Sequence, residues 1–92
     1  MKKAGLRPQI IIDCSRIRTR DDLHTLFREA LAFPDWYGRN LDALYDCLTE
    51  VSGKVRLLSW EAAENRLGVY GKKAKKVIAA AALHNESLDL YL

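Results

Sequence analysis

Cysteine is scarce in this chain, and the spacing of its two cysteines excludes most of the sites that cysteine builds. Cys14 and Cys47 are the only two among 92 residues. They supply neither the four thiolates of a structural zinc site nor a C-x-x-C redox pair. We therefore expect no metal and no cofactor. Both thiols should remain reduced and pack as small hydrophobic side chains.

Long hydrophobic runs are also missing. The first apolar run, Ile10 to Ile12, is stopped by Asp13, and a polar stretch follows Met1 to Lys3. Neither a signal peptide nor a membrane-spanning helix fits these segments. We expect a cytoplasmic protein without a membrane partner.

A catalytic site is hard to assemble from the remaining residues. His24 and His84 are the only histidines, and their spacing joins neither of them to a cysteine as base and nucleophile. Asp42 and Asp46 resemble a pair of acid and base, but one exposed helical turn offers no pocket that would separate their pKa values. We therefore predict no catalytic residue and no enzyme.

The chain does contain enough apolar residues for one core. Hydrophobic residues occupy 49% of the 92 positions, which suits a single small domain over residues 1–92. No internal repeat, linker or low-complexity tract divides that domain.

Strand and helix patterns alternate along the sequence. Gln9 to Cys14 holds three isoleucines in a continuous apolar run, which predicts a strand buried on both faces and hence a parallel sheet. A helix capped by Thr19 or Asp21 follows and is stopped by Pro34. The later elements are expected to be a helix beginning near Asn40, a strand at Val55 to Trp60, a helical turn at Glu61 to Leu67 closed by Gly68, a helix at Lys72 to His84 and a strand at Ser87 to Leu92. This order predicts an α/β fold in which a three-stranded parallel sheet packs with about four helices, and it leaves the strand order open.

The most informative stretch is Phe33 to Glu50, where acidic and aromatic residues share one short helix and the loop before it. Asp42 and Asp46 stand four positions apart, so their like charges repel by a few tenths of a kcal/mol in an isolated helix. A leucine stripe with helical spacing faces the core. That stripe is Leu41, Leu44 and Leu48, and the opposite side carries Asp42, Asp46, Thr49 and Glu50, bordered or supported by Trp36, Tyr37 and Tyr45.

The run from Tyr37 to Thr49, YG.NLDAL.DCLT, resembles the inhibitory helix of the barstar family and the loop before it. That family consists of intracellular protein inhibitors of the secreted ribonuclease barnase. Weaker similarity extends from the first strand through Asp21 to His24, then Leu58 to Trp60, to the last strand. The resemblance implies a proteinaceous ribonuclease inhibitor that occludes the active site of a basic extracellular-type ribonuclease, or of a ribonuclease-like toxin, by mimicking its substrate.

The resemblance also implies which residues bind the partner. Asp46 is the principal carboxylate and Asp42 the second, while Trp36 replaces a tyrosine that packs against the enzyme's active-site histidine. The implied partner-binding residues are Trp36, Tyr37, Gly38, Asn40, Asp42, Tyr45, Asp46 and Thr49. Four positions depart from the family: Arg39 replaces an acid and adds positive charge beside the acidic face, Tyr45 and Val51 replace tryptophans, and Ala80 replaces a glutamate. We therefore expect the partner to differ from barnase.

Charge leaves one alternative open. Residues 29–50 hold five acids and a single base, whereas the whole chain carries a net charge of +3. The basic run Lys72 to Lys76, together with Arg16, Arg18 and Arg20, is the basis for an alternative prediction of an RNA-binding or RNA-associated domain. No RNP motif or GXXG loop accompanies the lysines, so direct nucleic-acid binding is not expected.

Overall fold

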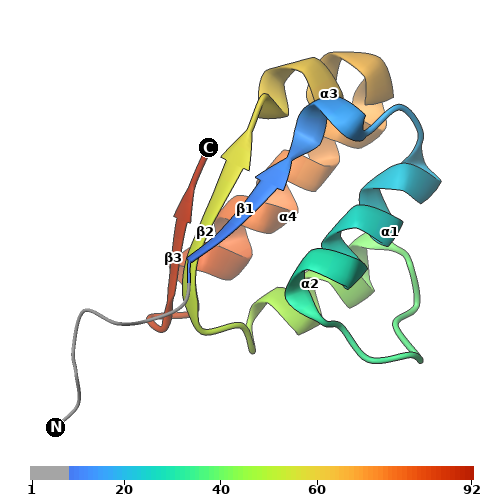
Figure 1. Ribbon diagram of the computed structural model, residues 1–92. Helices are drawn as coiled ribbons and strands as arrows, with labels where there is room; N and C mark the ends of the chain where they lie inside the picture. Colours follow the sequence, from blue (N-terminus) through green and yellow to red (C-terminus); the bar gives the residue numbers. More distant parts are fainter. Residues whose placement is uncertain (1–8) are drawn as a thin grey trace, which may run out of the picture.

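The structure is a computed structural model that describes residues 9–92 (Figure 1). Residues Met1 to Lys3, on which the exclusion of a signal peptide depends, lie outside this range. The elements are β1 (Gln9–Asp13), a 3-10 helix η1 (Cys14–Arg16), α1 (Arg20–Leu31), α2 (Leu41–Leu48), β2 (Gly53–Leu58), α3 (Trp60–Leu67), α4 (Val69–Leu83) and β3 (Leu88–Tyr91). The predicted α/β fold, a three-stranded parallel sheet with four α-helices, is confirmed. Within residues 9–92 no helix is long and apolar enough to cross a membrane.

The sheet has the strand order β1-β2-β3, and both strand pairs are parallel. Ile11, Arg56 and Tyr91 stand side by side in one row across it. The helices α1, α2 and α4 lie on one side of the sheet (Figure 1). The core therefore forms between that side and the helices, and the other face remains open to solvent.

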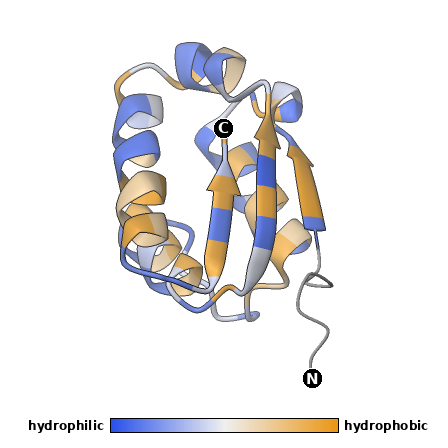
Figure 2. Ribbon diagram, turned by 90° about the vertical axis from the view of Figure 1, so that its left-hand side faces the viewer, coloured by the Kyte–Doolittle hydropathy of each residue, from blue (hydrophilic) through white to orange (hydrophobic). Residues whose placement is uncertain are grey.

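The open face corrects the prediction for the first strand. Ile12 is 1% exposed, but its neighbour Ile11 is 55% exposed, so β1 is buried on one face only. The strand also ends at Asp13, one residue before Cys14. Along β2 buried and exposed residues alternate, and Figure 2 looks onto these strands with their alternating bands of hydropathy. The isoleucine run predicted the wrong burial because, within residues 9–92, no helix covers the outer face of the sheet.

Caps define the start of α1 and α2 as the sequence suggests. Thr19, rather than Asp21, caps α1 in a capping box with Asp22, and Asn40 caps α2. α1 ends at Leu31, and its C-cap residue Ala32 has a left-handed φ of 55°, shortly before Pro34.

Two further boundaries differ from the expectation. β2 covers Gly53–Leu58, and Trp60 belongs to α3, because Ser59 turns the chain with a φ of 60°. α4 begins at Val69 rather than Lys72, and therefore contains Gly71. A Cβ at this glycine would lie 2.6 Å from the carbonyl oxygen of Glu64. Gly71 thus allows α3 and α4 to approach closely.

Candidate partner-binding site

The orientation of α2 agrees with its leucine pattern. Leu44 and Leu48 are completely buried, and Leu41 is partly buried. The helix is fixed at its start by Asn40, whose Oδ1 accepts a hydrogen bond from the backbone N–H of Ala43 at 2.8 Å. These contacts turn the opposite side of α2 to solvent.

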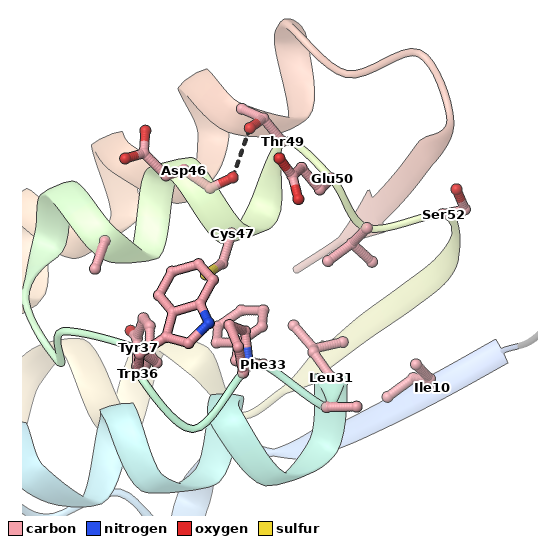
Figure 3. Close-up of a pocket in the computed structure, with 14 residues that line it drawn as sticks. Ile10, Leu31, Phe33, Trp36, Tyr37, Asp46, Cys47, Thr49, Glu50 and Ser52 are labelled. Carbon is pink, nitrogen blue, oxygen red and sulfur yellow. Dashed lines mark hydrogen bonds between the residues drawn. The ribbon is translucent and has the colours of Figure 1, made fainter.

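That side carries the acidic stripe, which we define as Asp42, Asp46 and Glu50. The three side chains are exposed. Asp42 and Asp46 stand one helical turn apart on α2, and Glu50 lies in the turn just after the helix ends. Within residues 9–92 none of their carboxylates takes part in a hydrogen bond or an ion pair. The backbone carbonyl of Asp46 accepts a hydrogen bond from the hydroxyl of Thr49 at 2.6 Å (Figure 3). All three carboxylates are therefore free to accept hydrogen bonds from a partner.

Two other charged residues near the stripe, Asp35 and Arg39, are already paired. Asp35 accepts a hydrogen bond from Arg28 at 2.8 Å. The guanidinium of Arg39 donates to the carboxylate of Asp21 and, at 2.6 Å, to the hydroxyl of Thr25. Arg39 is thus bound to α1 through Asp21 and Thr25.

An open groove of about 690 Å³ runs between α2 and the loop that precedes it (Figure 3). Phe33, Tyr37 and Cys47 contribute to its apolar lining, and Asp46 and Glu50 contribute carboxylates. Trp36, which also lines the groove, is 81% exposed. An aromatic ring that is this exposed, beside carboxylates, offers a partner both stacking area and charge.

Tyr37 lies deeper than a surface contact residue. Its side chain is 5% exposed, and its hydroxyl lies 2.5 Å from Nδ1 of His24. The other ring nitrogen of His24 lies 2.7 Å from the hydroxyl of Tyr70 on α4. In the neutral imidazole one nitrogen donates and the other accepts, so both hydroxyls are satisfied. Tyr37 therefore forms the inner wall of the groove and joins the loop to α1 and α4.

Burial governs the ionisation of this network. Desolvation lowers the pKa of His24 from 6.5 to about 4, and the charge of Arg39 acts in the same direction. Desolvation also raises the pKa of Tyr37. The network is therefore neutral at physiological pH. Sequence reasoning missed it, although an apolar helix face that includes a histidine could have signalled a buried imidazole.

The other expected contact residues hold the site together or border it. Tyr45 is partly buried, and its hydroxyl lies 2.9 Å from Nδ1 of His84, so it joins α2 to the end of α4. Gly38 is exposed, and a Cβ there would lie 3.3 Å from Nδ2 of Asn40 and 3.4 Å from Cβ of Ala43. Thr49 caps the C-terminal end of α2 and lines the groove.

A second open groove, of about 530 Å³, is lined by residues of α2 and α4. Its lining includes Asp42 and Asp46 from α2, and Lys76 and Ala80 from α4. Lys72 lies 3.5 Å from Glu64 of α3, whereas Lys76 lines this groove.

The cysteines show no sign of chemical activation. Cys14 is buried, and desolvation raises the pKa of its thiol to about 12. Cys47 is only partly buried, and its pKa is also raised by desolvation and by nearby Glu50. Both thiols are thus protonated at neutral pH and weakly nucleophilic. Among residues 9–92, no group of three or more histidine, cysteine, aspartate or glutamate side chains could hold a metal ion.

Comparison with known proteins assigns the family. The family model described as Barstar (barnase inhibitor) matches residues 7–89 of this chain. The chain belongs to the barstar family. It is also 40% identical over 76 residues to a protein of Bacillus subtilis (strain 168) named "Putative ribonuclease inhibitor YrdF", a match that covers 79% of this chain and 84% of that protein. The barstar family is one of inhibitors, and its matched range includes α2, both grooves and the loop before α2.

Proposed function

We propose that this barstar-family protein inhibits a basic ribonuclease, or a ribonuclease-like toxin, by covering the enzyme's active site with the acidic stripe. The observation that carries the proposal is the stripe itself, three exposed carboxylates without partners among residues 9–92. An enzyme that cleaves RNA surrounds the phosphate with cationic side chains. Carboxylates presented to such a cleft accept the same charge-assisted hydrogen bonds as the phosphate.

We assign different roles to the eight partner-binding residues. Asp46 enters the cationic cleft, Asp42 makes the second acidic contact, and Trp36 stacks on a side chain of the enzyme. Thr49 borders the contact at the end of α2. The remaining four, Tyr37, Gly38, Asn40 and Tyr45, hold the loop and α2 in place, which agrees with their burial, packing and hydrogen bonds.

The partner we propose is a basic nuclease other than barnase. At three positions expected to contact the enzyme, this chain has Tyr45, Val51 and Ala80 where the family has larger or charged residues. A changed contact surface favours a changed partner, because related inhibitors discriminate through such substitutions. We place the inhibitor in the cytoplasm, where it would protect cellular RNA from a nuclease that is normally secreted.

Two measurements test this function. Wild-type protein and the variant Asp46→Ala are used in parallel to capture partners, and inhibition of RNA cleavage is measured against a panel of barnase-type ribonucleases. Glu29→Gln, which neutralises an exposed acid on α1, is the matched control. We expect the wild type and the control to capture and inhibit the same nuclease, and Asp46→Ala to lose it. Failure of the wild type to capture or inhibit any nuclease would overturn the proposal.

Direct RNA binding is the alternative function, and a lysine variant in the same inhibition assay tests it. Replacing Lys72, Lys73 and Lys75 by glutamine should leave inhibition nearly intact under the proposed function. If these lysines contacted phosphates, RNA affinity would fall and its dependence on salt would flatten. Loss of inhibition in the lysine variant, with inhibition retained by Asp46→Ala, would show that the binding site lies at the lysines of α4 and not at the acidic stripe.

A further inference from the structure

Among the described residues, Lys76 is the one cation in the lining of the groove between α2 and α4. That lining also includes Asp42 and Asp46, the two carboxylates to which the proposed function gives the main contacts. The side chain of Lys76 is exposed, and among residues 9–92 it makes no ion pair. An ammonium group therefore stands within the surface that an inhibited nuclease would cover.

Contact with a partner changes the surroundings of this ammonium group. A cationic cleft that docks on Asp42 and Asp46 also approaches the α4 wall of the groove, since both carboxylates line that groove. Water that solvates Lys76 is then partly excluded, and an ammonium that loses water without gaining an anion is destabilising. A uniformly cationic nuclease surface would add repulsion between like charges.

The other lysines of α4 would not lose solvating water in this groove. Lys72 is paired with Glu64 at 3.5 Å on the side of α3. Lys75, like Lys72, lines a different groove that includes Trp60 and the C-terminal Leu92. Lys73 is exposed and does not line the groove between α2 and α4. Lys76 is therefore distinguished from its neighbours by position rather than by charge.

We propose that Lys76 is a specificity-determining residue that selects a nuclease with a carboxylate beside its cationic cleft. Asp42 and Asp46 bind the cations of the cleft, and Lys76 binds that carboxylate across the groove. A nuclease whose surface is cationic throughout is rejected at the same point. This inference rests on the proposed function, and it adds the charge pattern of the partner.

The test compares charge reversal at two lysines of the same helix. Wild type, Lys76→Glu and Lys73→Glu are titrated against the nucleases captured by the wild type and against barnase. Both variants change the net charge equally, so a long-range effect of charge would be the same in both. We expect Lys76→Glu to weaken binding to the captured nuclease at least about tenfold more than Lys73→Glu does. For barnase, Lys76→Glu should bind more tightly than the wild type.

The variant Lys76→Ala separates attraction from repulsion. We expect it to weaken binding to the captured nuclease severalfold, because the ion pair is lost without new repulsion. Equal effects of Lys76→Glu and Lys73→Glu, or tighter binding of the captured nuclease by Lys76→Glu, would overturn the inference. If Lys76 fails this test but Asp46→Ala still abolishes binding, the proposed function remains supported and only the specificity role of Lys76 is refuted. If the wild type binds no nuclease at all, both proposals fall together.

Discussion

Asp46 is both exposed and part of the lining of two grooves. It is exposed and unpaired among residues 9–92, so folding does not require its carboxylate. It also lines both grooves beside α2. Stability and binding should therefore respond differently when Asp46 is replaced.

We predict that Asp46→Ala changes the free energy of unfolding by no more than about 0.5 kcal/mol, as most surface substitutions do. Loss of repulsion from Asp42 could even stabilise α2 slightly. Binding to the nuclease should weaken by about 2 to 5 kcal/mol, because the cations of the cleft are left without an anion. Chemical denaturation and titration calorimetry measure the two values. A large loss of stability with unchanged affinity would make Asp46 a structural residue.

His24 is the titratable side chain whose burial has the clearest consequence for stability. Its ring is 2% exposed, and its pKa falls from 6.5 to about 4 through desolvation. The unfolded chain binds a proton below pH 6.5, whereas the folded chain remains neutral there until about pH 4. The contribution of His24 is therefore fully present above pH 6.5 and is lost as the pH falls from 6.5 towards 4.

We predict that this proton linkage destabilises the wild type by up to about 1.4 kcal/mol per pH unit between pH 6 and 5. His24→Gln keeps a polar side chain but does not titrate, so its lower stability at pH 7 should change less across the same interval. Urea denaturation of both proteins at several pH values measures the difference. Equal pH slopes for the two proteins would assign the linkage to other groups.

At the scale of secondary-structure elements, α4 depends on a glycine inside its first turns. Alanine normally stabilises a helix relative to glycine by about 0.5–1 kcal/mol. At Gly71, however, the added Cβ would lie 2.6 Å from the carbonyl oxygen and 2.8 Å from the Cα of Glu64, and backbone atoms cannot move aside like the end of a flexible side chain. Steric conflict between α3 and α4 should outweigh helix propensity here.

We predict that Gly71→Ala destabilises the protein by about 1 to 3 kcal/mol, as other substitutions that overpack a tight contact do. Lys73→Ala, at an exposed position of the same helix, serves as the control and should be neutral or slightly stabilising. Thermal and urea unfolding of both variants measure the effect. A stabilised Gly71→Ala would show that the two helices separate easily.

The elements also show which features the sequence could predict. The solvent side of α2 was predictable, because its leucines and acids repeat within a few residues and one helical period relates them. The burial of β1 was not, since it depends on which side of the sheet the helices cover. The contacts of His24 were equally hidden, because its hydrogen-bond partners lie 13 and 46 positions away. Contacts between residues far apart in the chain do not produce a periodic pattern in the sequence.

At the scale of the whole molecule, the acidic stripe lies on a chain with the opposite net charge. The chain carries +3, so at long range it repels a basic nuclease, whereas at contact the nearby carboxylates attract it. Salt screens charges beyond about 8 to 10 Å at physiological ionic strength. Added salt therefore weakens the distant repulsion as well as the attraction, and the two effects oppose each other in the association rate.

We predict that the association rate of the wild type with its nuclease falls only modestly as salt rises, while the dissociation rate depends on the desolvated pairs around Asp46. Replacing Lys73 and Lys75, which are exposed and lie away from the groove between α2 and α4, by glutamine removes two positive charges. That variant should associate faster at low salt and lose this gain as salt rises, with little change in dissociation. Stopped-flow kinetics over a range of salt concentrations measures both rates. A steep salt dependence of association already present in the wild type would contradict the prediction. Such a dependence requires that the acidic stripe dominate the long-range electric field, whereas the prediction assumes that the rest of the chain opposes it.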